Sequence, residues 1–167
     1  EDDGVAYYVD KMDDSTLVFR YIVELGHNSV ALDYVSSSSF IVEEGVIEDL
    51  ALNDVDLTLP DPATGSSISS GSNFIIDTRS PEVLSVVSDT DDGLFGVGDT
   101  IHVLVTFDEI VTVSGVPQIF METGEDDGVA YYVDKMDDST LVFRYIVELS
   151  HNSVALDYVS SSSFIVE

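Results

Sequence analysis

Two segments of the chain are almost identical, and this repetition limits the possible folds more than any other feature. Residues 1–43, the first repeat segment, and residues 125–167, the second, agree at 42 of 43 positions, and Gly26 is replaced by Ser150. The offset of 124 residues exceeds the 20–50 residues of a solenoid repeat and is close to the size of a domain. We therefore interpret the chain as one period plus part of the next, a window on a longer repetitive polypeptide. A short natural duplication is the alternative.

Apolar and polar residues alternate along two stretches, 100–107 and 140–148, as they do in half-buried β-strands. The side chains expected to face inward are Val103, Val105, Phe107, Leu141, Phe143, Tyr145 and Val147. Shorter strands are predicted at residues 55–59, 83–87, 129–133 and 154–158. The best helical window, residues 43–52, is brief, so we expect under about 10% helix. Turns spaced about 8–12 residues apart favour an all-β sandwich or barrel.

The charge balance limits the partners. The chain holds 33 Asp and Glu against 5 Lys and Arg, a net charge of −28, of which one 124-residue period carries −21. Such a chain repels nucleic acid and anionic lipid, and its expected partners are cations. Hydrophobic residues make up 44% of the chain, with 8 Phe and 8 Tyr, unlike a disordered acidic tail. No apolar run approaches 18 residues, so we expect no membrane insertion.

No catalytic constellation is found. The chain has no cysteine, which excludes disulfides, thiolate zinc sites and a cysteine nucleophile. The histidines, His27, His102 and His151, lack the spacing of a zinc site, and no G-x-S-x-G motif is present. Carboxylate pairs of the glycosidase kind arise by chance at this acid content. We expect the protein not to be an enzyme.

Several motifs resemble the Ig-like tandem repeats of large bacterial surface adhesins. The family's linker IDTTAP is similar to IDTRSP at residues 76–81, and its GDTI stands at residues 98–101. Its VTFSEAVTVTGTPQLTLETG resembles residues 105–124, and its LTFTYTVQAGDNSADLDY resembles residues 141–158. Its GGTIKDAAGNAATLTLP resembles residues 44–60. The resemblance covers nearly the whole period and implies Greek-key β-sandwich repeats in tandem, about 124 residues each.

The family layout places the boundary between repeats at the linker. Residues 1–76 are then the C-terminal part of one Ig-like repeat, ending in a Ser-, Gly- and Pro-rich segment at residues 60–73 and a closing strand. Residues 77–167 are the N-terminal part of the next repeat, and they lack the last strand, equivalent to residues 44–76. An open sheet edge invites pairing, either by the continuing chain or by a strand of a neighbouring copy. One departure from the family pattern is that AAGN reads LALN at residues 50–53, without the glycine.

Calcium is the expected ion. Residues 89–93 superficially resemble an EF-hand loop, but the frame is one residue short, and we reject that motif. Carboxylates on flexible loops still suit Ca²⁺, which takes 6–8 oxygen ligands. The candidate ligands that the resemblance implies are Asp77, Asp99, Glu109, Asp49 and Asn53. The alternative is that these acids form a solvated surface that keeps the protein soluble.

These observations favour a structural protein: a repeat of an extracellular filament or stalk at the cell surface, arrayed head to tail and made rigid by Ca²⁺. The expected partners are neighbouring copies of the same repeat, in a homopolymer or a long tandem chain. The alternative is an adhesin binding module that recognises a surface, a glycan or ice. Near-identical copies favour the stalk, because a tip domain usually differs from its neighbours.

Overall fold

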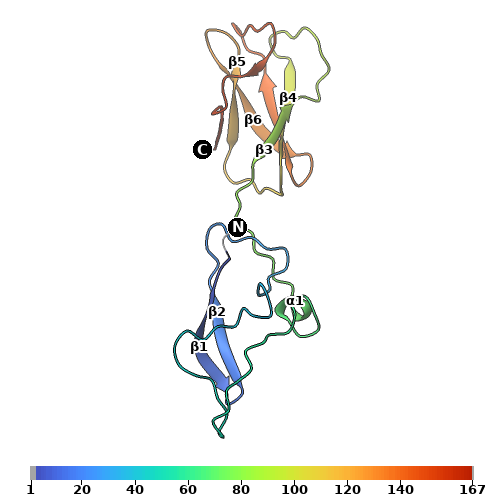
Figure 1. Ribbon diagram of the computed structural model, residues 1–167. Helices are drawn as coiled ribbons and strands as arrows, with labels where there is room; N and C mark the ends of the chain where they lie inside the picture. The colour runs from blue at the N-terminus through green and yellow to red at the C-terminus, as the bar shows by residue number, and fades with distance from the viewer. Residues whose placement is uncertain (1–2, 167) are drawn as a thin grey trace. The chain divides into compact units, whose positions relative to one another are not determined.

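The computed structural model of the chain describes residues 3–166. The chain divides into two compact units, Glu1–Arg79 (unit 1) and Ser80–Glu167 (unit 2), each of which holds one repeat segment. β-Strands are the main regular structure in both units, and the single helix in the described residues is one turn long (Figure 1). The expectation of an almost helix-free β-protein is therefore confirmed.

Unit 2 is one antiparallel sheet that curls into half a barrel (Figure 1). Its strands are β3 (Val83–Val87), β4 (Thr100–Phe107), β5 (Pro117–Glu122), β6 (Gly128–Lys135), β7 (Thr140–Ile146), β8 (Asp157–Tyr158) and β9 (Phe164–Val166). Their order across the sheet is β3-β4-β7-β6-β5-β8, and β9 also pairs with β5. The sequence led us to expect two facing sheets, whereas the described strands of unit 2 form one continuous hydrogen-bonded sheet.

The core of unit 2 lies on the inner face of this sheet, where the alternation predicted it. Val103 of β4 pairs with Phe143 of β7, and Val105 pairs with Leu141, so their side chains point to the same face. All four are buried, as is Tyr145, and Phe107 and Val147 pack against them half-buried. The seven predicted inward side chains are therefore confirmed. The core is completed by Val111, Ile119, Met121 and Ala130.

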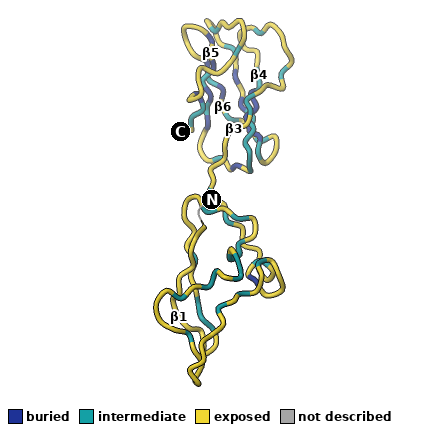
Figure 2. Tube along the Cα trace, in the orientation of Figure 1, coloured by how far each residue is buried: buried dark blue, intermediate teal, exposed yellow. Residues whose placement is uncertain are grey.

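Unit 1 has a β-hairpin, β1 (Ala6–Asp13) and β2 (Thr16–Tyr21), and the short helix α1 (Ile68–Gly71). The rest of the unit is irregular chain with two isolated bridges, Ser29 to Ile76 and Glu48 to Asp54. Among residues 3–79, Ser67 is the only residue that is buried. Figure 2 shows the contrast: the buried residues concentrate on the strands of unit 2, whereas β1 is exposed.

Two local expectations were wrong or only partly right. Residues 55–59 form no strand, whereas residues 43–52, a brief helical window that could equally be a loop, form a loop. Of residues 154–158, only Asp157 and Tyr158 are in a strand, β8. Leu52 occupies the glycine position of the AAGN pattern and adopts φ +66°, the left-handed region that favours glycine. The loop therefore keeps the glycine conformation without the glycine.

Candidate functional site

The repeated hairpin has the same internal geometry in both units. In unit 2 the rings of Phe143 and Phe164 meet edge to face, with centroids 5.6 Å apart at 89°. In unit 1 their counterparts, Phe19 and Phe40, meet at 5.6 Å and 87°. The acidic turn is also repeated: Asp137 Oδ1 accepts the Ser139 N–H, as Asp13 Oδ1 accepts that of Ser15. The repeat segment therefore carries its own local structure.

The surroundings of the hairpin differ completely. In unit 2, β7 is paired with β4 and β6 is paired with β5, so both outer edges of the hairpin are covered. In the described part of unit 1, β1 and β2 form a two-stranded sheet, and both outer edges are open. Phe143 is 0% exposed, whereas Phe19 is 41% exposed. The same aromatic face is therefore buried in the core of unit 2 and partly exposed to solvent in unit 1.

Unit 1 contains one feature that unit 2 lacks, a docked segment held by Asp33. The Asp33 carboxylate accepts the backbone N–H of Ala63 (3.0 Å), Ile68 (3.2 Å) and Ser69 (3.3 Å), and the Ser69 hydroxyl (2.6 Å). Two of these donors are the first N–H groups of α1, which have no partner inside the helix. The carboxylate therefore fastens residues 63–69 to the repeat segment.

The bonds to Asp33 also control its ionisation. Burial alone would raise its pKa, but the hydrogen bonds from the Ser69 side chain and from the backbone of Ala63 and Tyr34 favour the charged form. The balance holds the pKa of Asp33 far below its ordinary value of 3.8. The counterpart, Asp157, is exposed, and its one described hydrogen bond is from the neighbouring Tyr158 N–H (2.8 Å).

Two of the five candidate calcium ligands lie together. Asp49 Oδ1 accepts the N–H groups of Ala51 (2.8 Å) and Asn53 (2.9 Å), and Asp49 Oδ2 accepts the Asn53 side-chain amide (2.8 Å). These bonds, led by that of the Asn53 side chain, lower the pKa of Asp49. The pair closes a tight loop and leaves carboxylate and amide oxygens near one another.

The other three candidates are separated. Asp77 Oδ1 accepts the Arg79 N–H in unit 1 (3.1 Å), and Asp99 Oδ2 accepts the Gly96 N–H in unit 2 (2.7 Å). Asp99 precedes β4 and the half-buried Glu109 follows it, so a strand of about 26 Å lies between them. Within residues 3–166, no three His, Asp or Glu side chains converge on one point that would hold a metal ion.

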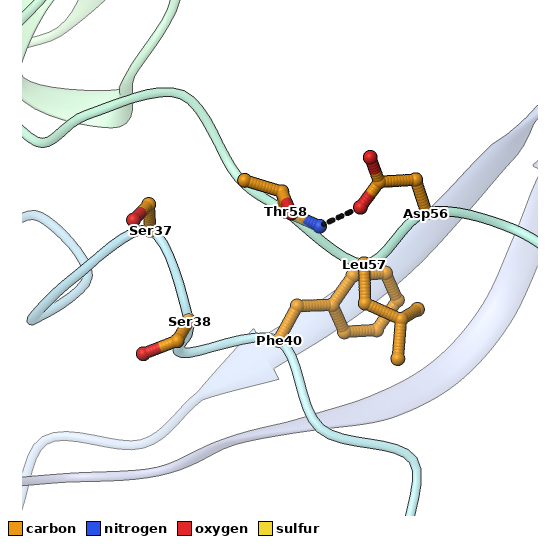
Figure 3. A pocket seen from close by; sticks show the side chains of 6 residues that line it. All are labelled: Ser37, Ser38, Phe40, Asp56, Leu57 and Thr58. Atoms are coloured by element: carbon orange, nitrogen blue, oxygen red, sulfur yellow. Dashed lines mark hydrogen bonds between the residues drawn. The ribbon is translucent and has the colours of Figure 1, made fainter.

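Two shallow hollows open on the surface, one in each unit. The hollow in unit 1, about 290 Å³, lies beside Phe40 and Leu57, whose side chains are drawn close together in Figure 3. Its polar side includes Asp56, whose carboxylate accepts the Thr58 N–H (3.0 Å). The hollow in unit 2, about 220 Å³, lies on the outer face of β6 and β7 beside Arg144 and His151. Its lining also includes Asp127, Tyr131 and Glu148.

Sequence reasoning missed Asp33 as an anchor. Its partners lie 30–36 residues further along the chain, in a segment that reads as a Ser- and Gly-rich linker. The available signal is the pair of identical Leu-Asp-Tyr triads at residues 32–34 and 156–158.

No helix among residues 3–166 has the length and apolar character needed to cross a membrane.

Comparison with known proteins found no relative of the chain. No known protein family, no curated protein and no solved structure matches the chain.

Proposed function

We propose that the protein is a structural repeat of an extracellular filament or stalk, in which Ig-like β-sandwich domains are arrayed head to tail and made rigid by Ca²⁺. The observation that carries the proposal is that one hairpin sequence is a covered core in unit 2 and an open-edged hairpin in unit 1. The strands that cover it in unit 2 belong to residues 80–122, and residues 3–79 contain no counterpart of them.

The physical argument concerns the stability of the β1–β2 hairpin without covering strands. A two-stranded hairpin is at best marginally stable in water, and three or more strands with an apolar face are needed for independent stability. Burying a Phe side chain completely contributes about 1.5–3 kcal/mol, and the face carrying Tyr8, Phe19 and Tyr21 forgoes much of this. Contiguous exposed apolar surface of this kind marks sites of protein association. Neighbouring copies of the same repeat have the matching strands.

The role of Ca²⁺ rests on charge. A net charge of −28 stores repulsion within each chain and between chains in an array. Calcium is a hard cation that takes oxygen ligands from flexible loops, the setting of the Asp49–Asn53 pair and of Asp77. A cation bound where consecutive domains meet reduces the repulsion and stiffens the joint.

Electron microscopy of the purified chain, with and without Ca²⁺, tests the proposal. We expect fibres with a regular axial repeat, straighter when Ca²⁺ is present, because every domain junction then has the same geometry. Globular particles with and without Ca²⁺, at concentrations high enough for association, would contradict the proposal.

A further inference from the structure

The inference rests on the function proposed above and concerns how one molecule joins the next. We propose that the outer edge of residues 150–161 in unit 2 is a docking site for residues 59–78 of a second molecule of the chain. The first repeat segment binds residues 59–78 of its own chain in unit 1, and unit 2 presents the same groups unused.

The central contact in unit 1 is a short piece of antiparallel pairing. Ser29 N–H donates to Ile76 O and Ile76 N–H donates to Ser29 O, both at 2.8 Å. Leu32 N–H donates to Phe74 O at 2.9 Å. Residues 74–76 thus pair with one edge of the repeat segment through a single antiparallel bridge and one further backbone bond, the kind of main-chain pairing used when a peptide adds to a sheet edge.

Contacts on either side extend this pairing. Tyr34 donates its hydroxyl to Pro60 O (2.7 Å), and Leu59 N–H donates to Ser37 O (2.8 Å). Together with the Asp33 carboxylate described above, these bonds place residues 59–69 along the repeat segment. The contact therefore combines backbone pairing around Ile76 with hydrogen bonds to the Asp33 carboxylate.

The other end of the contact is made by Thr78. Its hydroxyl accepts the Gly26 N–H (2.9 Å) and donates to His27 O (3.1 Å), and its N–H donates to Asn28 Oδ1 (3.0 Å). Gly26 is the one position at which the two repeat segments differ. Because it contributes only its N–H, the replacement by Ser150 preserves the donor.

Unit 2 offers the same groups. The counterparts of the atoms that bind residues 59–78 are Ser150 N, His151 O, Asn152 Oδ1, Ser153 N and O, Leu156 N, Asp157 Oδ2, Tyr158 Oη and Ser161 O. Within the described part of unit 2, none of these atoms has a hydrogen-bond partner. Among the described residues, Asp157 Oδ1, the counterpart of the Asp33 oxygen that binds Ile68 N–H, accepts only the Tyr158 N–H, just as Asp33 Oδ1 also accepts the Tyr34 N–H. Asp157 and Tyr158 are exposed, whereas Asp33 and Tyr34 are half-buried.

The opposite edge of the same residues is already occupied. Asn152 N–H donates to Thr123 O (2.8 Å), and Val159 N–H donates to Phe120 O (3.1 Å), beside the pairing of β8 with β5. Residues 59–78 use neither of the corresponding groups in unit 1. Both partners can therefore be bound at once, because successive backbone groups of a strand point to alternate edges.

The site in unit 2 is also better prepared. Its strand is held on one edge by β5, so less conformational freedom is lost when a second partner binds. The incoming segment carries Leu59 and Ile76, which are half-buried in unit 1, and Phe74, which is exposed there. To bind there, residues 59–78 leave residues 26–37 of their own chain, so one set of hydrogen bonds is exchanged for an equivalent set between molecules. Each molecule then donates a segment from unit 1 and accepts one at unit 2, a heterologous contact that extends without closing.

Engineered cysteines test this interface cleanly because the chain has none of its own. A directly hydrogen-bonded antiparallel pair has Cα atoms about 5.5 Å apart, within disulfide range. The test variant is Ile76→Cys with Ser153→Cys, and the matched control is Ile76→Cys with Ser29→Cys. We expect a ladder of covalent oligomers from the test variant under mild oxidation and a monomer with an internal disulfide from the control. A test variant that keeps free thiols, or that links residues 76 and 153 within one chain, would overturn the interface.

The unmodified chain gives a second readout. Peptides that include Gly26 or Ser150 distinguish the two repeat segments by mass, so hydrogen exchange can be followed for each. We expect the amides of Ser153 and Leu156 to gain protection as the concentration rises, and unchanged exchange counts against the docking. Regular fibres without the bond between residues 76 and 153 would leave the proposed array standing and remove this interface. If neither fibres nor the bond between residues 76 and 153 form, both the proposed array and the proposed interface are wrong.

Discussion

Tyr145 and His151 are joined in unit 2 by a 2.8 Å contact between the phenol oxygen and Nδ1, and Tyr21 and His27 repeat it in unit 1 at 2.8 Å. In each case a glutamate N–H also donates to Nδ1, so this nitrogen is an acceptor and the Tyr hydroxyl is its donor. Tyr145 is buried, and burial followed by the Glu148 charge raises its pKa, whereas Tyr21 is only half-buried. The contact is therefore a property of the repeat segment, whatever covers it.

Replacing the same core ring in each repeat segment should have unequal effects. Phe143→Ala should destabilise unit 2 by about 3–5 kcal/mol, because Phe143 is fully buried and leaves a cavity. Phe19→Ala, the matched control, should cost well under about 1 kcal/mol in the dilute chain, because Phe19 is 41% exposed. Hydrogen exchange of peptides containing Ser150 or Gly26 measures each unit separately. Equal losses would show that Phe19 is covered in solution.

The one difference between the repeat segments should affect stability in opposite directions. Ser150 adopts φ +80° and Gly26 adopts φ +97°, a region that costs residues with a Cβ about 1–2 kcal/mol. Ser150→Gly should stabilise unit 2 by about 1 kcal/mol, and Gly26→Ser should destabilise unit 1 by a similar amount. Chemical denaturation followed by hydrogen exchange checks both. A destabilising Ser150→Gly would mean that the serine side chain forms a compensating contact.

Acid should release the segment that Asp33 holds. The folded pKa of Asp33 lies far below the unfolded value of about 3.9, so its contribution is complete above pH 3.9 and is lost as the pH falls through the folded pKa. NMR should show the amides of Ala63 and Ser69 shifting with the Asp33 carboxyl as the pH falls below 3.9. Asp33→Asn should expose these amides at neutral pH, and Asp157→Asn, the control, should not. A folded Asp33 pKa near 3.9 would contradict the anchor.

Calcium should raise the melting temperature of the assembled protein. A ligand that binds only the folded state at 100 times its Kd contributes about 2.7 kcal/mol, which corresponds to several degrees for a chain of this size. Calorimetry with Ca²⁺, against NaCl at matched ionic strength, separates binding from screening. Asp49→Ala and Asp99→Ala should each reduce the increase. Identical melting temperatures before and after chelation of Ca²⁺ would show that Ca²⁺ does not stabilise the protein.

The central strands of unit 2 were predictable because their side chains alternate between a buried and a more exposed face, although β4 and β7 pair across 34–46 residues of sequence. The alternation at 100–107 and 140–148 identified both β4 and β7, and the strand phase was correct at Phe107 and Phe143. Leu104, on the face expected to be polar, is nevertheless buried, because β4 is a central strand flanked by β3 and β7. Alternation identifies one buried face and does not indicate what covers the other.

The structure of unit 1 was less predictable. Residues 55–59 alternate as a strand does, yet they form none, because a strand needs continuous pairing and these residues make only scattered backbone bonds, from Val55 N–H to Ile47 O and from Leu59 N–H to Ser37 O. Asp33 gave no local signal, because its bonds depend on the path of residues 63–69. Among the candidate calcium ligands, the spacing of Asp49 and Asn53 placed them in one loop, but it did not reveal their direct hydrogen bond.

Sedimentation velocity of the 167-residue chain across a wide concentration range tests the central claim most directly. Because each molecule offers a donor segment in unit 1 and an open edge in unit 2, the account predicts concentration-dependent growth into species without a fixed upper size. A compact 18.1 kDa monomer at every concentration, unfolding in one cooperative step, would contradict it.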